Sequence, residues 1–261
     1  MARSADPAGC GRDVIIAALP AYNEAEALPR LLQRMRESQS RLPESMRVIV
    51  VDDGSKDETA AVAERCDSAE MRVEVVRHDR NRGLHGALDT GFRAALARAQ
   101  PGDWILTMDA DDTHPPDLIA GMLAKAKCEG ASVVIASRFQ AGAEWFGLSW
   151  DRLLFSKTVS WMFRLAWPMR GVRDYTCGYR IYRAELLTAA YQRWGDGFVN
   201  EPSFACMPDV LWKVSRLSPV FAEVPLSLHY DRKPGESKMN VGRTIRRTLA
   251  LIAKRRIGIT S

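Results

Sequence analysis

The chain has 261 residues, of which 46% are hydrophobic and 26% charged, a composition typical of a globular protein. Its length suits one large domain with at most a small extension, and no apolar run approaches the roughly 18 residues of a membrane span. The net charge of +5 favours an anionic partner: phosphate, nucleotide, anionic lipid or nucleic acid. The five scattered cysteines form no CxxC pair, which favours reduced thiols in a cytosolic protein over a disulfide or zinc framework.

The first half of the chain alternates between strand-like and helix-like segments. Apolar or β-branched runs predict strands at residues 14–20, 47–53, 73–78, 103–109 and 132–139. Helical spacing and capping signals predict helices at residues 25–37, 55–66, 86–99 and 115–127, with Ser55 as a cap and a proline opening the last helix. Strands separated by helices pair through right-handed crossovers. We therefore expect an α/β fold: a single Rossmann-like domain with a mainly parallel central sheet and peripheral C-terminal helices.

The two ends of the chain differ in character from this main domain, which we place at residues 13–240. Residues 1–12 have no signal-peptide pattern and are expected to form a flexible tail. Residues 148–169 are aromatic and amphipathic, which suits a helix at a membrane interface or one buried against the core or in a dimer interface. Residues 241–261 predict a basic helix or tail, either lying on anionic lipid or simply exposed.

A run of carboxylates follows the predicted strand at residues 103–109. Asp109 and Asp111 stand at alternate positions, so both side chains can point to the same side of an extended chain. Such a pair is costly unless a cation neutralises it, and Mg²⁺ or Mn²⁺ typically takes one or two carboxylates together with substrate phosphates. The pattern therefore predicts a metal–diphosphate site in which Asp109 and Asp111 are the metal ligands. We expect Asp112 to be a solvated neighbour.

Seven segments together resemble family 2 glycosyltransferases, in order and in spacing, over roughly residues 13–240. Within that family they are most similar to dolichol-phosphate mannose synthase and bacterial polyprenyl-phosphate glycosyltransferases. The segments are PAYNEAEAL, VVDDGSKDET, NRGLHGALDTGFRAAL, MDADDTHPPDLI, VVIASRF, DYTCGYRIYR and EVPLSLHYDRKPGESKM. The resemblance implies a nucleotide-sugar-binding fold of the glycosyltransferase A type, a metal-assisted inverting mechanism and a lipid-phosphate acceptor.

The resemblance also implies roles for individual residues. Those implied to hold the nucleotide sugar are Pro20, Ala21, Tyr22, Glu24, Val51, Asp53, Asp109, Ala110, Asp111, Arg232 and Lys238. Those implied to meet the acceptor phosphate are Arg138, Arg152 and Ser156. The implied catalytic residues are Asp111, Arg138, Arg152 and Arg232, where the arginines supply planar forks for phosphate oxygens. Other interpretations remain for several of these residues: surface charge for Arg138 and Arg152, packing for Tyr22 and a turn for Asp53.

A phosphate acceptor is already mostly dianionic at neutral pH and needs positioning rather than a general base. If the acceptor is instead a hydroxyl, Asp174 or Glu201 is the best candidate base, although each also fits a hydrogen-bonding loop carboxylate. Some relatives carry glutamine where this chain has Thr113, which raises the possibility of a different metal coordination. His114 stands before two prolines, where we expect a structural role.

Three functions are consistent with these patterns. The leading hypothesis is transfer of a hexose to a polyprenyl phosphate, with GDP-mannose as the first donor to test and UDP-glucose as the next. The alternatives are a glycosyltransferase with a hydroxyl acceptor and an inactive nucleotide-sugar-binding scaffold. We expect a cytoplasmic protein at the cytoplasmic membrane face, bound to the membrane surface or to a separate membrane subunit, and no nucleic acid partner. The sequence leaves the oligomeric state open.

Overall fold

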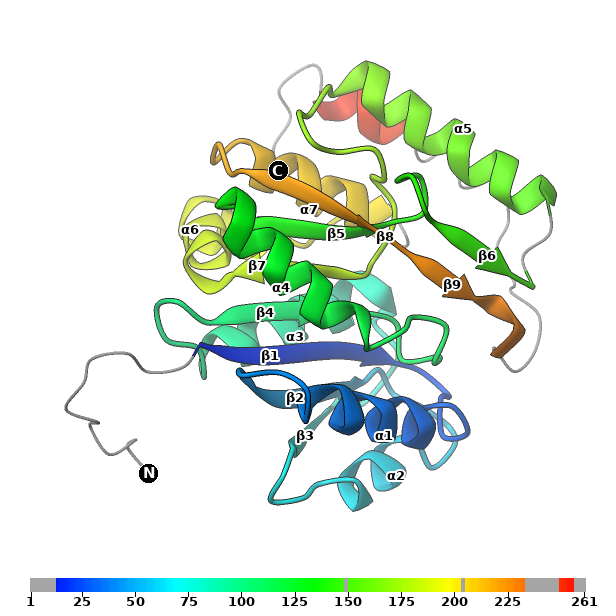
Figure 1. Ribbon diagram of the computed structural model, residues 1–261, viewed down its shortest axis with the longest axis vertical. Coiled ribbons are helices and arrows are strands. Elements are labelled where there is room, and N and C mark those ends of the chain that lie inside the picture. Colours follow the sequence, from blue (N-terminus) through cyan, green and yellow to red (C-terminus); the bar gives the residue numbers. More distant parts are fainter. Residues whose placement is uncertain (1–12, 148–149, 203–204, 233–248, 256–261) are drawn as a thin grey trace.

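Seven strands form one central sheet through the middle of the molecule (Figure 1). The structure is a computed structural model that describes residues 13–147, 150–202, 205–232 and 249–255. The strands of the sheet are β1 (Val14–Ala21), β2 (Ser45–Asp52), β3 (Arg72–Arg77), β4 (Trp104–Thr107), β5 (Val133–Ser137), β7 (Arg180–Arg183) and β8 (Phe221–Pro225). Their order is β3-β2-β1-β4-β7-β5-β8, and β7 alone among them runs antiparallel to its neighbours. The predicted α/β fold with a mainly parallel sheet is confirmed.

Helices cover both faces of this sheet. They are α1 (Leu28–Gln39), α2 (Thr59–Arg65), α3 (Gly83–Leu96), α4 (Leu118–Glu129), α6 (Ala184–Trp194) and α7 (Cys206–Ser215). Helices α1 and α4 lie over one face, and α3, α6 and α7 lie over the other (Figure 1). Every residue of β4 and β5 is buried, as expected for short apolar strands covered on both sides.

Two helix starts differ from the predictions. Helix α2 begins at Thr59, and no side chain caps it, so the predicted capping role of Ser55 is wrong. The Ser55 hydroxyl instead accepts a hydrogen bond from the Asn23 backbone N–H (2.9 Å). The prolines at 115 and 116 lie in the turn before α4, whose N-cap is Asp117. In both places, residues that resemble helix-start signals shape loops at the edge of the sheet.

The carboxyl ends of β1, β2 and β4 meet at one edge of the sheet. Ala21 lies opposite Asp52 in the β1–β2 register, and Ala18 lies opposite Thr107 in the β1–β4 register. Strand β5 points the same way as β4, because both are antiparallel to β7 between them. Arg138, directly after β5, therefore stands at the same edge. Ligands of open α/β sheets bind at this kind of edge.

A further group of elements lies beside β8, in the part of the chain for which the sequence predicted the fewest strands and helices. Helix α5 (Trp150–Ala166) lies next to a two-stranded sheet of β6 (Glu144–Phe146) and β9 (Ser227–His229), and a short 3₁₀ turn, Tyr230–Arg232, follows β9 (Figure 1). Residues 249–255 are helical, and Leu251 and Arg255 within them are buried. None of the helices in the described ranges is long and apolar enough to cross a bilayer.

Candidate active site

The loops after β1 and β2 are tied to each other by hydrogen bonds. The Asn23 backbone N–H donates to the Ser55 hydroxyl (2.9 Å), and the Glu24 backbone N–H donates to the Thr59 hydroxyl (2.8 Å). Asn23 adopts a left-handed conformation with φ of 57°, which asparagine tolerates better than most residues. These contacts fix residues 20–24, which carry four of the predicted nucleotide-sugar ligands, against the end of β2.

Asp53 is buried at the end of β2 and is held by three donors. Its carboxylate accepts hydrogen bonds from the backbone N–H groups of Arg82 and Gly83, both at 2.8 Å, and from His78 Nδ1 at 2.7 Å. The other ring nitrogen, Nε2, lies 2.9 Å from the Thr90 hydroxyl on α3. Because an ionised carboxylate only accepts, His78 carries a proton on Nδ1. Asp53 thus joins β2, β3 and α3, a more constrained role than a simple turn residue.

Several other residues predicted to bind the nucleotide sugar differ in accessibility. Tyr22 is 40% exposed, Pro20 is half-buried, and Ala21 and Ala110 are buried. Val51 is fully buried within β2, with its side chain near Gly91 of α3. A contact between Val51 and a nucleoside would therefore involve its backbone. Among these residues, Tyr22 has the largest exposed surface for stacking.

The loop after β4 holds the two predicted metal ligands in fixed orientations. Asp111 is buried, and its Oδ1 accepts hydrogen bonds from the Thr113 hydroxyl (2.6 Å) and the Thr113 backbone N–H (3.2 Å). Asp109 is exposed, and its backbone N–H donates to His114 Nδ1 (3.2 Å). The His114 ring packs against Tyr179, with centroids 5.2 Å apart. Thr113 and His114 therefore position the two aspartates, which gives His114 the structural role expected.

Asp112 is not the solvated neighbour that the sequence suggested. It is buried, and its carboxylate forms ion pairs with Arg34 (2.5 Å) and Arg30 (3.8 Å) of α1. Its φ of 59° places its backbone in the left-handed region, which few residues other than glycine adopt. The two arginines neutralise one of the three crowded carboxylates and fasten the loop to α1. This contact has no local sequence signal, because the partners are 78 residues apart.

The oxygen donors of this loop suit a divalent cation whose coordination shell is completed by oxygens of the substrate. Within the described residues, no group of three or more His, Cys, Asp or Glu side chains forms a complete metal site. Two carboxylates on one short loop are what Mg²⁺ or Mn²⁺ uses when substrate phosphates and water supply the remaining oxygens. Asp109 and Asp111 fit that arrangement, and Thr113 orients the second of them.

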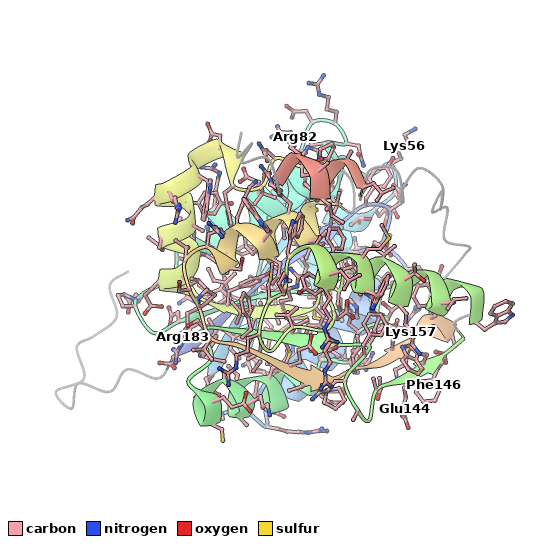
Figure 2. The ribbon with its side chains drawn as sticks, turned by 90° about the horizontal axis from the view of Figure 1, so that it is seen from above. Lys56, Arg82, Glu144, Phe146, Lys157 and Arg183 are labelled. Atoms are coloured by element: carbon pink, nitrogen blue, oxygen red, sulfur yellow. The ribbon has the colours of Figure 1, made fainter. Side chains whose placement is uncertain are left out.

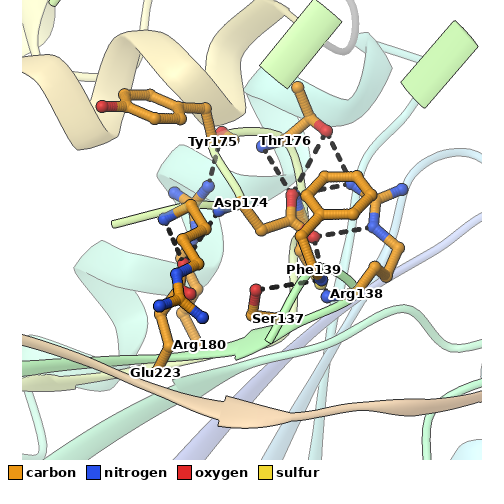
Figure 3. Close-up of polar contacts among 10 residues, drawn as sticks. Ser137, Arg138, Phe139, Asp174, Tyr175, Thr176, Arg180 and Glu223 are labelled. Carbon is orange, nitrogen blue, oxygen red and sulfur yellow. Dashed lines mark hydrogen bonds and ion pairs between the residues drawn. The ribbon is translucent and has the colours of Figure 1, made fainter. Parts of the chain in front are cut away.

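The end of β5 carries a buried ion pair between Arg138 and Asp174 (Figure 3). The Arg138 Nε and Nη2 atoms each lie 2.8 Å from an Asp174 carboxylate oxygen, and Nη2 also donates to the Thr176 hydroxyl (2.6 Å). Burial alone would raise the pKa of Asp174, but the Arg138 charge and several hydrogen bonds lower it overall. Arg138 is thus neither a solvated surface charge nor a cation without a partner.

The other candidate base, Glu201, also faces a cation. Its carboxylate lies 3.5 Å from Lys254 Nζ in the C-terminal helical segment. The next residue of that segment, Arg255, is buried and forms a 2.6 Å ion pair with Asp209 of α7. Lys213 completes this cluster at 2.6 Å from Asp209. The described part of the basic tail is therefore anchored to α7.

Three further predicted residues, Arg152, Arg232 and Lys238, are described only in part or not at all, whereas Ser156 is described in full. Ser156 and the backbone of Arg152 lie in α5, and the backbone of Arg232 ends the 3₁₀ turn after β9. The side chains of Arg152 and Arg232, and the whole of Lys238, lie outside the described residues. His229, three residues before Arg232, donates its backbone N–H to the Thr113 carbonyl (3.0 Å). That bond brings the start of the RKPGESK segment to the loop of Asp109 and Asp111.

Comparison with known proteins identifies the family. Residues 16–189 match the profile described as glycosyl transferase family 2. The chain belongs to that family. It is 35% identical over 236 residues to an undecaprenyl-phosphate mannosyltransferase of Micrococcus luteus, covering 87% of this chain and 88% of the relative. It is 32% identical over 237 residues to a polyprenol monophosphomannose synthase of Mycolicibacterium smegmatis, covering 90% and 84%.

Solved structures support the fold. Glucosyl-3-phosphoglycerate synthase of Mycobacterium tuberculosis, crystallised with Mn²⁺, UDP-glucose and phosphoglyceric acid, superposes with a TM-score of 0.63 at 21% identity. The match covers 96% of this chain and 81% of that one. The chain is therefore a glycosyltransferase with this α/β architecture, and the resemblance inferred from its motifs is confirmed.

Proposed function

We propose that this glycosyltransferase transfers a hexose from a nucleoside-diphosphate sugar to the phosphate of a polyprenyl lipid. GDP-mannose is the first donor to test and UDP-glucose the second. The similarity to enzymes named for undecaprenyl phosphate and polyprenol, which spans between 84% and 90% of each chain, supports a lipid-phosphate acceptor. A divalent metal, Mg²⁺ or Mn²⁺, would be held by Asp109 and Asp111, and would neutralise charge on the diphosphate when bound.

The observation that carries this proposal is the state of the two candidate bases. Asp174 is fully buried in a bidentate pair with Arg138, and Glu201 faces Lys254. A carboxylate whose pKa is lowered by a neighbouring cation is a weak base for an alcohol proton. Asp174 is such a carboxylate. A phosphate acceptor needs no such base, because its second pKa near 6 leaves it mostly dianionic at neutral pH.

The reaction then needs only positioning and charge compensation. An oxygen of the acceptor phosphate attacks the anomeric carbon, a new carbon–oxygen bond forms, and the bond to the diphosphate breaks. The nucleoside diphosphate leaves with the electron pair, so no proton transfer is required. Displacement from the opposite side inverts the anomeric configuration. In this scheme Arg138, Arg152 and Ser156 orient the acceptor phosphate, and Arg232 and Lys238 compensate charge on the leaving group.

The test is release of nucleoside diphosphate from a panel of sugar donors, measured without acceptor, with polyprenyl phosphate and with the matching polyprenol. We expect release only with the phosphate, and NMR of the product should show the inverted anomer. Release with the alcohol alone would favour the hydroxyl-acceptor alternative and refute this proposal. Metal–nucleotide binding without turnover on any donor would favour an inactive scaffold.

Helix α5 supplies the surface for meeting a lipid. Trp150, Leu154, Trp161 and Leu165 are between 56% and 77% exposed and fall on one side of the helix. The opposite side packs on the core through buried residues such as Phe163. An exposed apolar side of this size suits an interfacial helix. We infer that α5 rests on the membrane surface. In this arrangement its exposed side would be the interfacial helix expected for residues 148–169, and its opposite side would be the helix buried against the core.

Vesicle sedimentation tests this membrane role. Replacing both Leu154 and Trp161 by serine should lower binding to phosphatidylcholine vesicles at least about 10-fold, because two large apolar side chains no longer leave water. The matched control replaces the exposed Val220 by serine, away from α5. Equal binding by the α5 double variant and the wild type would refute the role of this helix.

A further inference from the structure

Strand β9 connects the end of β5 with the loop after β4. The Leu226 backbone N–H, just before β9, donates a hydrogen bond to the carbonyl of Ser137, the last residue of β5 (3.0 Å). At the other end of β9, the His229 backbone N–H donates to the Thr113 carbonyl (3.0 Å). Thr113 in turn donates both its hydroxyl and its backbone N–H to Asp111. The Asp111 carboxylate is therefore linked to the end of β9 through a single residue.

An aromatic ring on β6 packs on the end of β9. The two strands pair in parallel, with Phe146 opposite His229, and their rings stack with centroids 4.7 Å apart and planes 10° apart. Phe146 is 41% exposed and does not belong to the main hydrophobic core. Figure 2 shows it near Glu144 of the same strand, at the margin of the molecule. The stack therefore restrains His229 without being part of the core.

The residue after Phe146 makes a second contact between β6 and the chain that follows β9. Gly147 has a φ of 71°, in the left-handed region that glycine adopts readily. A Cβ atom at this position would lie 2.7 Å from the Asp231 backbone nitrogen and 3.0 Å from its Cα. The backbone of residue 147 thus lies directly against the 3₁₀ turn that ends at Arg232. The end of β6 therefore holds both β9 and this turn in place.

The His229 ring suits a supporting role rather than metal binding. Within the described ranges, His229 does not form a three-ligand metal group with Asp109 and Asp111. The contact that joins His229 to their loop is its backbone N–H, which every residue except proline carries. Its ring faces Phe146, and its Nδ1 lies 3.6 Å from the Asp231 carboxylate. The stack therefore requires a planar ring at position 229, whatever the acid–base chemistry of that ring.

We propose that Phe146 is a positioning residue for the metal site, and that it acts through its stack on His229. The inference rests on the proposed function, in which Asp109 and Asp111 hold the metal of the donor. The stack fixes the end of β9, the His229 N–H then fixes the Thr113 carbonyl, and Thr113 fixes the direction of Asp111 Oδ1. A carboxylate that its neighbours already hold in one direction binds a cation more tightly than one that the cation must first order.

The experiment titrates Mn²⁺ into the full chain in the presence of GDP, and of UDP in a second series, and records nucleotide binding by calorimetry. Phe146→Ala should need about fivefold more Mn²⁺ for half-maximal binding, because an aromatic pair contributes about that factor to an equilibrium constant. Its thermal midpoint should stay within about 3 °C of wild type, since the ring lies outside the core. Phe146→Tyr keeps the ring and should keep the wild-type Mn²⁺ dependence. The matched control, Val220→Ala, shortens another exposed apolar side chain and should change neither quantity.

Two substitutions at His229 separate support by the ring from chemistry of the imidazole. His229→Phe retains a planar ring beside Phe146 and should bind Mn²⁺ and nucleotide like wild type, whereas His229→Ala should lose as much as Phe146→Ala. An equal loss in His229→Phe and His229→Ala would show that the imidazole itself acts, and would overturn the proposal. Wild-type Mn²⁺ dependence in Phe146→Ala would overturn it as well.

Asp111→Asn distinguishes failure of this proposal from failure of the proposed metal site. Titrated in the same way, this variant should lose the Mn²⁺ dependence of nucleotide binding. If it does and Phe146→Ala still binds like wild type, the positioning role is refuted while the metal site stands. If Asp111→Asn and wild type respond to Mn²⁺ alike, the metal role of Asp111 in the proposed function is refuted, and the positioning role with it.

Discussion

The proposed donor half of the site, formed by the loops after β1, β2 and β4, and the proposed acceptor half, at the end of β5, hold their carboxylates in different ways. In the donor half, backbone N–H groups, a hydroxyl and an imidazole orient Asp53 and Asp111. In the proposed acceptor half, Asp174 faces the Arg138 side chain, and Glu201 faces Lys254 of the C-terminal helical segment elsewhere in the molecule. Hydrogen bonds from neutral donors fix the direction in which a carboxylate points. The Arg138 cation also compensates the charge of the buried Asp174 carboxylate.

The loop after β4 contains both kinds of carboxylate, and Asp112 is the ion-paired one. It stands between Asp111 and Thr113, yet Arg34 and Arg30 of α1 neutralise it. Compensating one of three negative charges reduces repulsion in the loop. The crowding of aspartates at the end of β4 thus combines one structural acid with the two proposed metal ligands.

The largest expected effect comes from removing the charge of a donor-half carboxylate. Asp111→Asn should lower kcat by about 10³-fold with an unchanged thermal midpoint, because the amide keeps the shape but binds a divalent cation poorly. Sugar transfer and thermal unfolding are measured on the same preparation. Asp117→Asn, an exposed acid just before α4, serves as the control and should keep full activity. Near-normal turnover by Asp111→Asn would refute the metal role.

The next largest effect concerns stability in the acceptor half. Asp174→Asn leaves the Arg138 charge without its buried partner and should lower the free energy of unfolding by about 3 kcal/mol. The folded-state pKa of Asp174 is lowered, so its stabilisation is fully present above the unfolded pKa near 3.8 and is lost as the pH falls from there through the folded-state pKa. Urea unfolding from pH 7 to pH 3 should therefore show the difference between wild type and variant narrowing toward the acidic end. A constant difference would contradict the ion-pair explanation.

The sequence predicted the donor half far better than the acceptor half. Strand periodicity and the short motifs PAYNE, DDGS and DADD placed Asp53, Asp109 and Asp111 at one sheet edge. Those signals are local, and parallel pairing brings the carboxyl ends of the strands to the same edge. Antiparallel β7 and the pairing of β6 with β9 carry no comparable local signal. The partners of Arg138 and Asp112 come from segments 36 and 78 residues away, so only the folded chain reveals them.

A smaller effect is expected at His78, which no motif singled out. Its ring links Asp53 to Thr90, so it positions the nucleoside side of the donor half without being a predicted ligand itself. His78→Ala should raise KM for the nucleotide sugar about 10-fold with little change in kcat, since the lost hydrogen bonds act on binding. His78→Asn, which retains a donor near Asp53, should restore part of the affinity. A fall in kcat alone would contradict this positioning role.

The smallest expected effect concerns Glu223, whose carboxylate lies near that of Asp174 but has a different electrostatic environment. Burial raises the pKa of Glu223. Its Oε1 accepts hydrogen bonds from the backbone N–H groups of Arg173 (2.6 Å) and Asp174 (2.8 Å), whereas its Oε2 has no hydrogen-bond partner among the described residues. A raised folded-state pKa contributes stability below the unfolded value of 4.5 that is lost as the pH rises through the folded pKa.

Glu223→Gln keeps an oxygen for both backbone donors and cannot ionise, so it should equal or exceed wild-type stability at pH 7 by up to about 1 kcal/mol. Urea unfolding at pH 4 and pH 7 checks this, with the exposed Glu58→Gln as the control. Glu223 lies beside Asp174, but Arg138 pairs only with Asp174. A variant less stable than wild type at pH 7 would show that the Glu223 charge is compensated after all, and would extend the ion-paired character of the acceptor half to this residue.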